Sequence, residues 1–428
     1  MTDNMDEAAL ALEAIQKKLL GKKLNYEEIY AIMDEISHKR LGDILTTYFA
    51  ASGYSKGFSN EEIYFLTKAM IETGQKMKFQ GIVADKHSIG GVPGTRTTLI
   101  VVPIIAAAGF TIPKSSSRAI TTPGGTADDM EVLAPVTFTE KEIYKIVEKT
   151  NGCIVWGGSI DMAPADDELI KVEEPLAFES YDKFLVSIMA KKIAFGSNHI
   201  VIDLPYGDHV KVHKIDDAEL IKTKFEYLAD RFKVKLHVSI HKVEEPAGRG
   251  IGPLLETRES LRVLEQKENR PIDLEKRAVT LAGLLLDLCL KDVPKTTKDH
   301  VRKTFGSGQA WAKHLLATGE AHAKMREIIK AQGGKSDIIS DALHPGGFTY
   351  PVLAKQAKTV KQVNSKNATI IAKLLGAPVQ KKSGLYLNKK VKEQTVAGEP
   401  MYTLYSESEY NLKEAKDSLS NFPILEYE

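Results

Sequence analysis

The sequence predicts an α/β protein with three parts: a small all-helical domain, a larger mixed α/β domain with a mostly parallel sheet, and a small C-terminal α+β subdomain. Three observations predict this fold class. Up to about residue 75, apolar residues recur only at helical spacing. From Gly81 onward, short apolar strand candidates alternate with helical segments. From Thr349, one helix is followed by short strand candidates that glycines separate.

The helical domain is predicted from apolar residues that lie three and four positions apart. The helices expected on this pattern are residues 9–20, 26–36, 41–51, 63–73 and 181–194. The fourth follows a capping box of Ser59 and Glu62, and Gly74 ends it. We therefore expect a discontinuous helical domain of residues 1–80 and 165–196.

The middle of the chain alternates strands with helices, which favours a parallel sheet with helices on both faces. The strand candidates are residues 82–84, 111–113, 153–156, 200–203 and 236–240. The helices expected between them are 97–108, 141–149 and 218–232. Thr139 and Glu142 form a capping box before the second of these. We expect this α/β domain to comprise residues 81–164 and 197–345.

The C-terminal segment, residues 346–428, is expected to form the α+β subdomain. Several helices precede it, from Gly252 to about Lys330. Its own helix is predicted at residues 364–374. Its short strand candidates are residues 386–387, 391, 396 and 401–404.

Composition limits the classes of function. The chain has 428 residues, of which 43% are hydrophobic and 27% charged, so it can bury a full core. A formal net charge of +1 gives no basis for nucleic-acid binding. Cys153 and Cys289 lie in apolar runs and are expected to be buried thiols. Without a signal-peptide pattern or a membrane-spanning run, a cytoplasmic protein without a membrane partner is expected.

The first segment that can perform chemistry is Asp-Lys-His-Ser-Ile-Gly-Gly-Val-Pro-Gly-Thr-Arg-Thr-Thr, residues 85–98. It follows a strand candidate and opens a helix, where free backbone amides favour an anion. Lys86, Ser88 and Thr97 add a cation and two hydroxyl groups. The spacing is neither that of a P-loop nor Gly-x-Gly-x-x-Gly. The pattern favours an anion-binding turn over a turn that is only structural.

Three further segments contain candidate site residues. Residues 113–126 combine three serines, Arg118 and several threonines before a Gly-Gly turn, and the alternative is a solvated loop. Ser187 and Lys191 are four residues apart and share one helix face, although this pair alone is better explained by a surface lysine beside a buried serine. The glycine turn at 246–253 leads into another helix and is weak evidence alone.

Together these segments resemble the thymidine phosphorylase and pyrimidine-nucleoside phosphorylase family. The shared motifs are Lys-His-Ser-x-Gly-Gly-Val, Ser-x-Arg followed by Gly-Gly-Thr, Ala-Pro-Ala-Asp at 163–166, and Ser-x-x-Ala-Lys-Lys at 187–192. They occur in the family's order over nearly the whole chain. Gly-Gly-Val-Pro-Gly, Ser-Ser-Arg-Ala-Ile-Thr, Glu-Val-Leu-Ala-Pro-Val and Pro-x-Gly-Arg-Gly-Ile-Gly-Pro are most similar to the AMP phosphorylase branch.

The resemblance implies roles for particular positions. The positions that match the family's phosphate site are Lys86, Ser88, Gly90, Gly91, Thr97, Ser116 and Thr126. Those that match base-holding positions of the pyrimidine enzymes are His87, Arg118, Ser187 and Lys191. Those that match nucleotide-contacting positions of the AMP-cleaving branch are Gly91, Ser117, Arg118, Ala119, Ile120, Thr121, Thr122, Thr126, Ser187 and Lys211. Catalysis is expected to depend on Lys86, His87 and Glu179, and no metal-ligating residues are implied.

The chain departs from the AMP-cleaving branch at three points. Glu179 stands where that branch has an aspartate proton donor, and the extra methylene displaces the carboxyl unless the backbone shifts. Thr122-Pro123-Gly124 replaces the branch's usual small residues. The branch also has an extra N-terminal domain, whereas this sequence starts directly with the helical domain.

The expected function is phosphorolysis of the N-glycosidic bond of a nucleoside 5′-monophosphate of the AMP, CMP or UMP type, giving free base and ribose 1,5-bisphosphate. Three alternatives stay open: a thymidine or pyrimidine-nucleoside phosphorylase that releases (deoxy)ribose 1-phosphate, a phosphoribosyltransferase of related fold, and an inactive nucleotide-binding homologue. Asp128 and Asp129 would suit the magnesium site of the second.

The resemblance also sets expectations for cofactors and partners. Inorganic phosphate is the expected co-substrate, and no organic cofactor is implied. The family suggests a potassium ion near Gly94 and Glu256, and a homodimer formed through the helical domain. We expect a nucleoside or nucleotide as the substrate.

Overall fold

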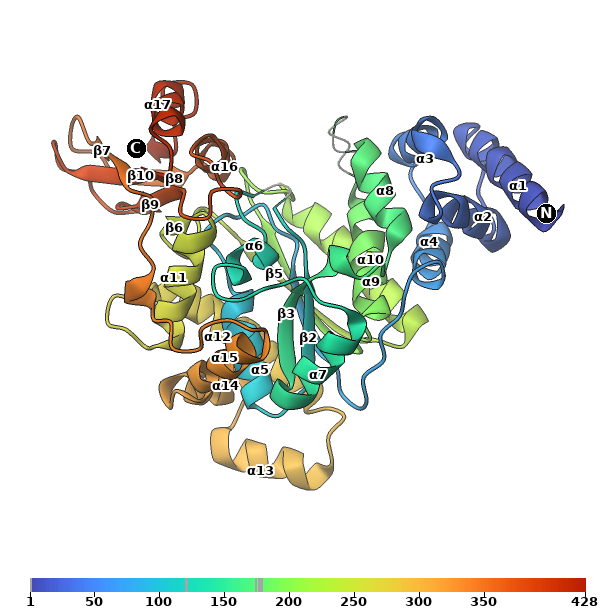
Figure 1. Cartoon of the computed structure of the whole chain (residues 1–428), viewed down its shortest axis with the longest axis horizontal. Helices are drawn as coiled ribbons and strands as arrows, with labels where there is room; N and C mark the ends of the chain where they lie inside the picture. Colours follow the sequence, from blue (N-terminus) through green and yellow to red (C-terminus); the bar gives the residue numbers. More distant parts are fainter. Residues whose placement is uncertain (1, 120–121, 174, 176–179) are drawn as a thin grey trace. The chain divides into compact units, whose positions relative to one another are not determined.

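The computed structural model describes residues 2–428 with the exception of 120–121, 174 and 176–179 (Figure 1). The chain divides into two compact units. The first comprises Met1–Val83, Gly157–Asn198 and Leu220–Leu236, and the second comprises Ala84–Trp156, His199–Glu219 and His237–Glu428. The predicted boundary at residue 346 falls inside the second unit.

The first unit is helical. Its elements are α1 (Thr2–Leu19), α2 (Tyr26–Ser37), α3 (Gly42–Lys56), α4 (Asn60–Glu72), the 3-10 turn η1 (Gly157–Ser159), α8 (Pro164–Glu173), α9 (Tyr181–Ala194) and most of α10 (Ile215–Phe232). The predicted capping box before α4 is confirmed, because the Ser59 side chain accepts the Glu62 amide while Glu62 accepts the Ser59 amide. The Glu62 carboxylate also pairs with buried Lys18 at 2.7 Å, which ties α4 to α1.

The second unit begins as an α/β domain. Its strands are β1 (Ala84–Ser88), β2 (Ile112–Ser116), β3 (Gly152–Trp156), β4 (His199–Tyr206) and β5 (Lys235–Lys242). Its helices are α5 (Thr98–Ala107), α6 (Thr126–Met130), α7 (Glu140–Thr150), α11 (Pro253–Leu264), α12 (Ile272–Cys289), α13 (Lys295–Phe305), α14 (Gly308–Ala317) and α15 (Glu320–Ala331). The predicted capping box of Thr139 and Glu142 opens α7.

Parallel pairing organises the site-bearing strands. Strand β1 pairs with β4, and the order β1-β4-β5 forms a three-stranded sheet. Strands β2 and β3 pair in parallel and lie side by side in Figure 1. The Ala84 amide donates to the Thr111 carbonyl at 2.8 Å, which links the starts of β1 and β2. Helix α5 packs on α12 and α15, and its residues Thr98–Ala106 are buried because all but the first are apolar.

The C-terminal part is α+β. Its elements are η3 (Ser340–Ala342), β7 (Phe348–Leu353), β8 (Val360–Val363), α16 (Ser365–Leu374), β9 (Gly384–Leu387), β10 (Pro400–Ser406), α17 (Glu409–Ser418) and β11 (Leu425–Tyr427). An antiparallel sheet has the order β6-β9-β10-β7, where β6 (Gly250–Ile251) comes from the turn before α11. Strands β11 and β8 pair separately. In Figure 1 the strands β7, β9 and β10 lie together in orange and red.

The predicted fold class is confirmed, but some element bounds differ. The first strand was expected at residues 82–84, whereas β1 continues to Ser88. Its parallel register places Lys86 opposite Val201 and Ser88 opposite Asp203, so pairing with β4 extends the strand past the apolar run. Strand candidates at residues 391 and 396 are wrong, because residue 391 lies in a turn and residue 396 in irregular chain between β9 and β10.

Candidate functional site

Lys86 lies at the centre of a polar cluster at the carboxyl end of β1. Its side chain is buried, and its Nζ donates to Ser88 Oγ at 2.5 Å and to Thr97 Oγ1 at 2.6 Å. Thr97 is the N-cap residue of α5, so the cluster connects the strand with the start of the helix. Burial lowers the pKa of Lys86 to about 8, although the Asp203 carboxylate opposes this shift. Three predicted phosphate-site residues are thus in direct contact.

A charged network from neighbouring strands supports this cluster. Ser88 Oγ donates to Asp203 Oδ2 at 2.6 Å, and Arg277 of α12 pairs with Asp203 and reaches His241 Nδ1 at 2.8 Å. Burial alone would raise the pKa of Asp203, but Arg277 and Lys86 hold it below its ordinary value. Asp203, Arg277 and His241 were not among the residues predicted from the sequence. They lie far from Lys86 in the sequence, so no local motif connects them with it.

Glycines shape the turn after β1. Gly90 and Gly91 have φ values of 87° and 82°, which side-chain-bearing residues rarely adopt. A Cβ on Gly91 would lie 3.0 Å from the Lys211 amide nitrogen and 3.3 Å from Lys211 Cγ. The predicted nucleotide-contacting residues Gly91 and Lys211 are therefore adjacent, although they are far apart in the sequence. His87 lies between Lys86 and Ser88 on β1, opposite Ile202.

The second candidate segment runs from the end of β2 to the start of α6. The Ser116 Oγ is buried and has no hydrogen-bond partner among the described residues. The Asp128 carboxylate accepts the Ala119 amide at 2.7 Å and the Gly125 amide at 2.9 Å, which draws the two ends of the segment together. Thr126 begins α6. This segment therefore contains a buried hydroxyl group without a hydrogen-bond partner among the described residues, and it leads into α6.

Arg118 is already paired with carboxylates. Its guanidinium donates to both carboxylate oxygens of Glu131, at 2.7 and 2.8 Å, and to Asp128 at 3.2 Å. It also lies 5.0 Å from the centre of the Trp156 ring. The hydrogen bond from Arg118 lowers the pKa of Glu131 to about 2. Lys381 of the C-terminal part contacts the same two carboxylates at 2.9 Å, a contribution that sequence reasoning missed.

The pair on α9 belongs to the first unit. As its four-residue spacing predicts, Ser187 and Lys191 lie on one helix face, and both contact Asp166 at 2.7 Å. Lys191 also pairs with Asp167 at 3.1 Å. Burial lowers the pKa of Lys191, but the two aspartates more than offset this and raise it, so the side chain is a cation. Asp166 is the last residue of the Ala-Pro-Ala-Asp motif, and Asp167 follows it directly.

Glu179, Ile120 and Thr121 lie outside the described residues. Ser117 accepts the Ala127 amide through its carbonyl, and Thr122 Oγ1 donates to the Gly124 carbonyl at 2.8 Å. Cys153 and Cys289 are buried free thiols, as predicted, and burial raises the pKa of both to about 12.

Among the helices that the structure describes, none has the length and apolar character needed to span a bilayer. Within 2–119, 122–173, 175 and 180–428, no three His, Cys, Asp or Glu side chains group as metal ligands would.

Family models match three parts of the chain. A helical bundle domain of a glycosyl transferase family matches residues 12–74, and the α/β domain of that family matches residues 80–322. A pyrimidine nucleoside phosphorylase C-terminal domain matches residues 359–422. The matched parts follow the order of the helical, α/β and α+β elements.

Curated relatives cover almost the full chain. An AMP phosphorylase of Methanocaldococcus jannaschii is 43% identical over 409 residues, which are 96% of this chain and 79% of the relative. A putative thymidine phosphorylase of Legionella pneumophila is 41% identical over 410 residues, 96% of this chain and 76% of the relative. Anthranilate phosphoribosyltransferase from Thermus thermophilus has a similar fold, with a TM-score of 0.61 and 16% identity over 75% of this chain and 99% of that structure.

Proposed function

Because the chain belongs to the thymidine and pyrimidine-nucleoside phosphorylase family, a family of pentosyltransferases, we propose that it cleaves nucleoside 5′-monophosphates with inorganic phosphate. The products are a free base and ribose 1,5-bisphosphate. The main observation in support of this proposal is the close approach of Gly91 and Lys211 beside the Lys86 cluster. We assign one lysine to each of two phosphates, Lys86 to the one that attacks and Lys211 to the one on the substrate's 5′ carbon.

The attacking phosphate is assigned to the Lys86 cluster. Lys86 supplies a buried cation, Ser88 and Thr97 supply hydroxyl groups, and the unpartnered Ser116 Oγ supplies another donor. Buried donors with fixed geometry bind an oxyanion strongly because they need little reorganisation. Asp203 holds Ser88 in place.

The 5′-phosphate is assigned to Lys211 and the Gly91 turn. A Cβ at position 91 would lie only 3.0 Å from the Lys211 backbone nitrogen, so glycine lets this lysine approach the turn. A nucleoside lacks the phosphate that such a cation would bind. The relatives named AMP phosphorylase support the nucleotide, whereas those named putative thymidine phosphorylase support the nucleoside alternative.

The proposed reaction is a direct displacement. A phosphate oxygen forms a bond to C1′ while the C1′–N bond breaks, and the base leaves with a proton on its ring nitrogen. Positioning of the two reactants supplies part of the rate acceleration. For a purine, we assign proton donation to Glu179. For a pyrimidine, His87, Arg118, Ser187 and Lys191 are assigned to the base.

A phosphoribosyltransferase is disfavoured by the contacts of the acidic residues at α6. Asp129 pairs with Arg96, and Asp128 pairs with Arg118 and Lys381 as well as with two backbone amides. A magnesium–pyrophosphate site built on these carboxylates would have to displace three cationic side chains. The potential metal ligands are therefore already neutralised.

A substrate panel tests the proposal. AMP, CMP, UMP, thymidine, uridine and cytidine are each incubated with phosphate, and free base is measured. We expect release from a nucleotide at a kcat/KM at least tenfold above that of its nucleoside. Higher activity on thymidine or uridine would favour the nucleoside alternative. Activity only with pyrophosphate and magnesium would favour the transferase, and binding without turnover would favour an inactive homologue.

A further inference from the structure

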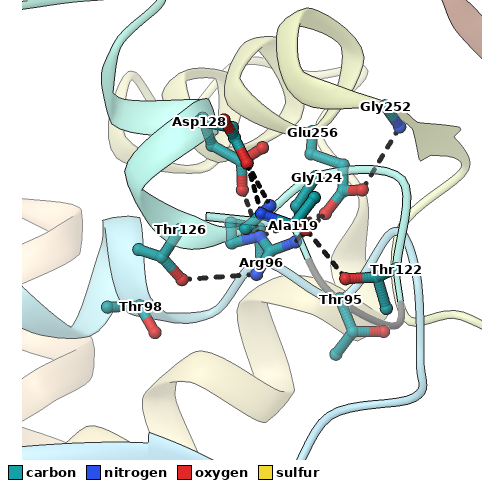
Figure 2. A network of polar contacts seen from close by, with 12 residues as sticks. Thr95, Arg96, Thr98, Ala119, Thr122, Gly124, Thr126, Asp128, Gly252 and Glu256 are labelled. Atoms are coloured by element: carbon teal, nitrogen blue, oxygen red, sulfur yellow. Dashed lines mark hydrogen bonds and ion pairs between the residues drawn. The ribbon is translucent and has the colours of Figure 1, made fainter. Parts of the chain in front are cut away.

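Arg96 lies at the centre of a polar network that joins three segments of the second unit (Figure 2). Its guanidinium donates to the Gly124 carbonyl at 2.7 Å, to Thr126 Oγ1 at 3.3 Å and to Glu256 Oε2 at 3.1 Å. It also pairs with Asp129. The side chain is only 15% exposed, and both carboxylates are fully buried.

The network fixes the turn that starts α6. Arg96 holds the Gly124 carbonyl and the Thr126 hydroxyl from one side, whereas Asp128 holds the Gly125 amide from the other. Thr126 is also one of the residues assigned to the phosphate site. A substitution of Arg96 therefore alters the contacts of Thr126, which is expected to contact phosphate.

Arg96 is itself fixed by the turn before α11. The Gly94 carbonyl accepts the Gly248 amide at 2.8 Å, and the Thr95 hydroxyl accepts the Ala247 amide at 2.9 Å. The Arg96 carbonyl accepts Ser260 Oγ at 3.3 Å. The guanidinium is therefore anchored at its backbone as well as at its tip.

The residues around Gly94 and Glu256 do not fit the monovalent cation that the family resemblance suggests. The Gly94 carbonyl is used by Gly248, one Glu256 oxygen accepts the Gly252 amide at 3.2 Å, and the other accepts Arg96. A potassium ion needs several free oxygen ligands. Here the Arg96 guanidinium already supplies the positive charge next to the buried carboxylates.

We propose that Arg96 is a built-in cation that positions the Gly124–Thr126 turn for phosphate, so that this chain needs no potassium ion for activity. Arg96 is a positioning residue, because it acts on phosphate through Thr126 and the turn. The inference rests on the proposed phosphorolysis. Burial lowers the pKa of Arg96, but Asp129 and Glu256 more than offset this, so the guanidinium stays charged at all working pH values.

The test combines a cation series with substitutions. The wild-type chain, Arg96→Lys and Arg96→Ala are assayed with saturating nucleotide and varied phosphate, in choline salts and in potassium chloride at equal ionic strength. Arg270→Ala is the matched control, since Arg270 also forms a partly buried ion pair, with Glu275, outside the site.

The expected results separate positioning from general stability. Wild-type KM and kcat change less than twofold with potassium. Arg96→Ala raises the phosphate KM by about 10- to 100-fold, because charge-assisted bonds to the turn are lost. Potassium or guanidinium ions restore part of that loss. Arg96→Lys has an intermediate KM, and Arg270→Ala retains the wild-type value.

Other results overturn the proposal. A wild-type chain that needs potassium for full activity contradicts it, as does an Arg96→Ala variant whose phosphate KM equals that of Arg270→Ala. If Arg96→Ala does not fold, the wild-type cation series and Arg96→Lys decide the question. A lysine variant with wild-type KM would then exclude a role for the guanidinium contacts.

A readout without turnover distinguishes this inference from the proposed function. Phosphate binding to the wild-type chain raises its melting temperature equally in choline and potassium salts. An increase seen only in potassium contradicts the inference even when turnover is normal. A chain that releases no base from any substrate contradicts the proposed function instead.

Discussion

At the scale of single residues, the candidate phosphate site depends on charged side chains that are buried. Lys86 is enclosed by Ser88, Thr97 and the Asp203–Arg277 pair. A buried ammonium group loses hydration, so its pKa falls unless an anion is present. An incoming phosphate therefore finds a cation that has few competing contacts with water.

Lys86 gives a prediction for pH dependence. Its pKa of about 8 means that the side chain is charged below that pH and neutral above it. We therefore expect the phosphate KM of the wild-type chain to rise as pH increases through about 8. Lys86→Arg, which stays charged, should remove this rise, and Lys86→Ala should lower kcat/KM for phosphate by about 100- to 1000-fold at pH 7.

Steady-state kinetics from pH 6 to pH 10 measure this effect, and circular dichroism verifies the fold of each variant. A flat wild-type profile, or near-normal turnover of Lys86→Ala, would contradict the assignment of phosphate to this lysine.

Glu179 gives a second residue-scale prediction. A carboxamide cannot supply a proton, so Glu179→Gln should lower kcat for a purine nucleotide by about 100-fold or more, with little change in KM. Stopped assays of adenine release measure this. Glu148→Gln, at an exposed position of α7, is the control. Undiminished adenine release by Glu179→Gln would exclude Glu179 as the donor.

At the scale of elements, the sequence correctly predicted features that depend on residues close together in the chain. The capping boxes at Ser59 and Thr139 were predicted because both partners lie within one helical turn. The Lys-His-Ser motif was expected in the turn after the first strand, but it lies on β1. Its position on β1 depends on pairing with β4, more than 100 residues away.

Long-range partners explain the rest of what the sequence could not predict. No sequence motif identifies Arg277, Asp203 or Lys381, because the partner of each side chain lies far away in the sequence. Arg96 stood inside the predicted glycine segment but received no role. Its contacts with Glu256 and Gly124 are visible only in three dimensions.

The turn before α6 allows a prediction at this scale. A Cβ on Gly125 would lie 2.4 Å from the Ser117 carbonyl oxygen and 2.4 Å from the Arg118 carbonyl carbon. Gly125→Ala must therefore open the segment, at a cost of about 2 kcal/mol in the free energy of unfolding. We also expect the phosphate KM to rise, because Ser116 and Thr126 lie at the two ends of this segment.

Gly347→Ala is the matched control, because a Cβ there meets nothing within 4 Å and the backbone is outside the left-handed region. Urea unfolding and phosphate kinetics are compared for both variants. Equal stabilities and equal KM values would show that the close approach at Gly125 is unimportant.

At the scale of the whole molecule, the C-terminal part shares structure with the α/β part. Strand β6 pairs with β9, and Ile251 is buried in the C-terminal hydrophobic cluster. Arg249 donates to the carbonyls of Leu387 and Asn388, at 3.2 and 2.9 Å. Lys381 reaches the carboxylates that hold Arg118. The C-terminal part therefore supports the segment assigned to the base.

A truncation after residue 345 tests this connection. It removes the partner strand of β6 and exposes Ile251, so we expect a large loss of soluble protein, since unpaired strand edges and apolar surface promote aggregation. The Lys381→Ala variant separates the contribution of the C-terminal part to folding from its contribution to nucleotide binding. It leaves the sheet intact and should fold with a nearly unchanged melting temperature, because partly exposed ion pairs contribute little to stability. However, it should raise the KM for the nucleotide several-fold, since Arg118 then alone balances Asp128 and Glu131. A truncated chain with wild-type melting temperature and kinetics would show that the C-terminal part folds and acts independently.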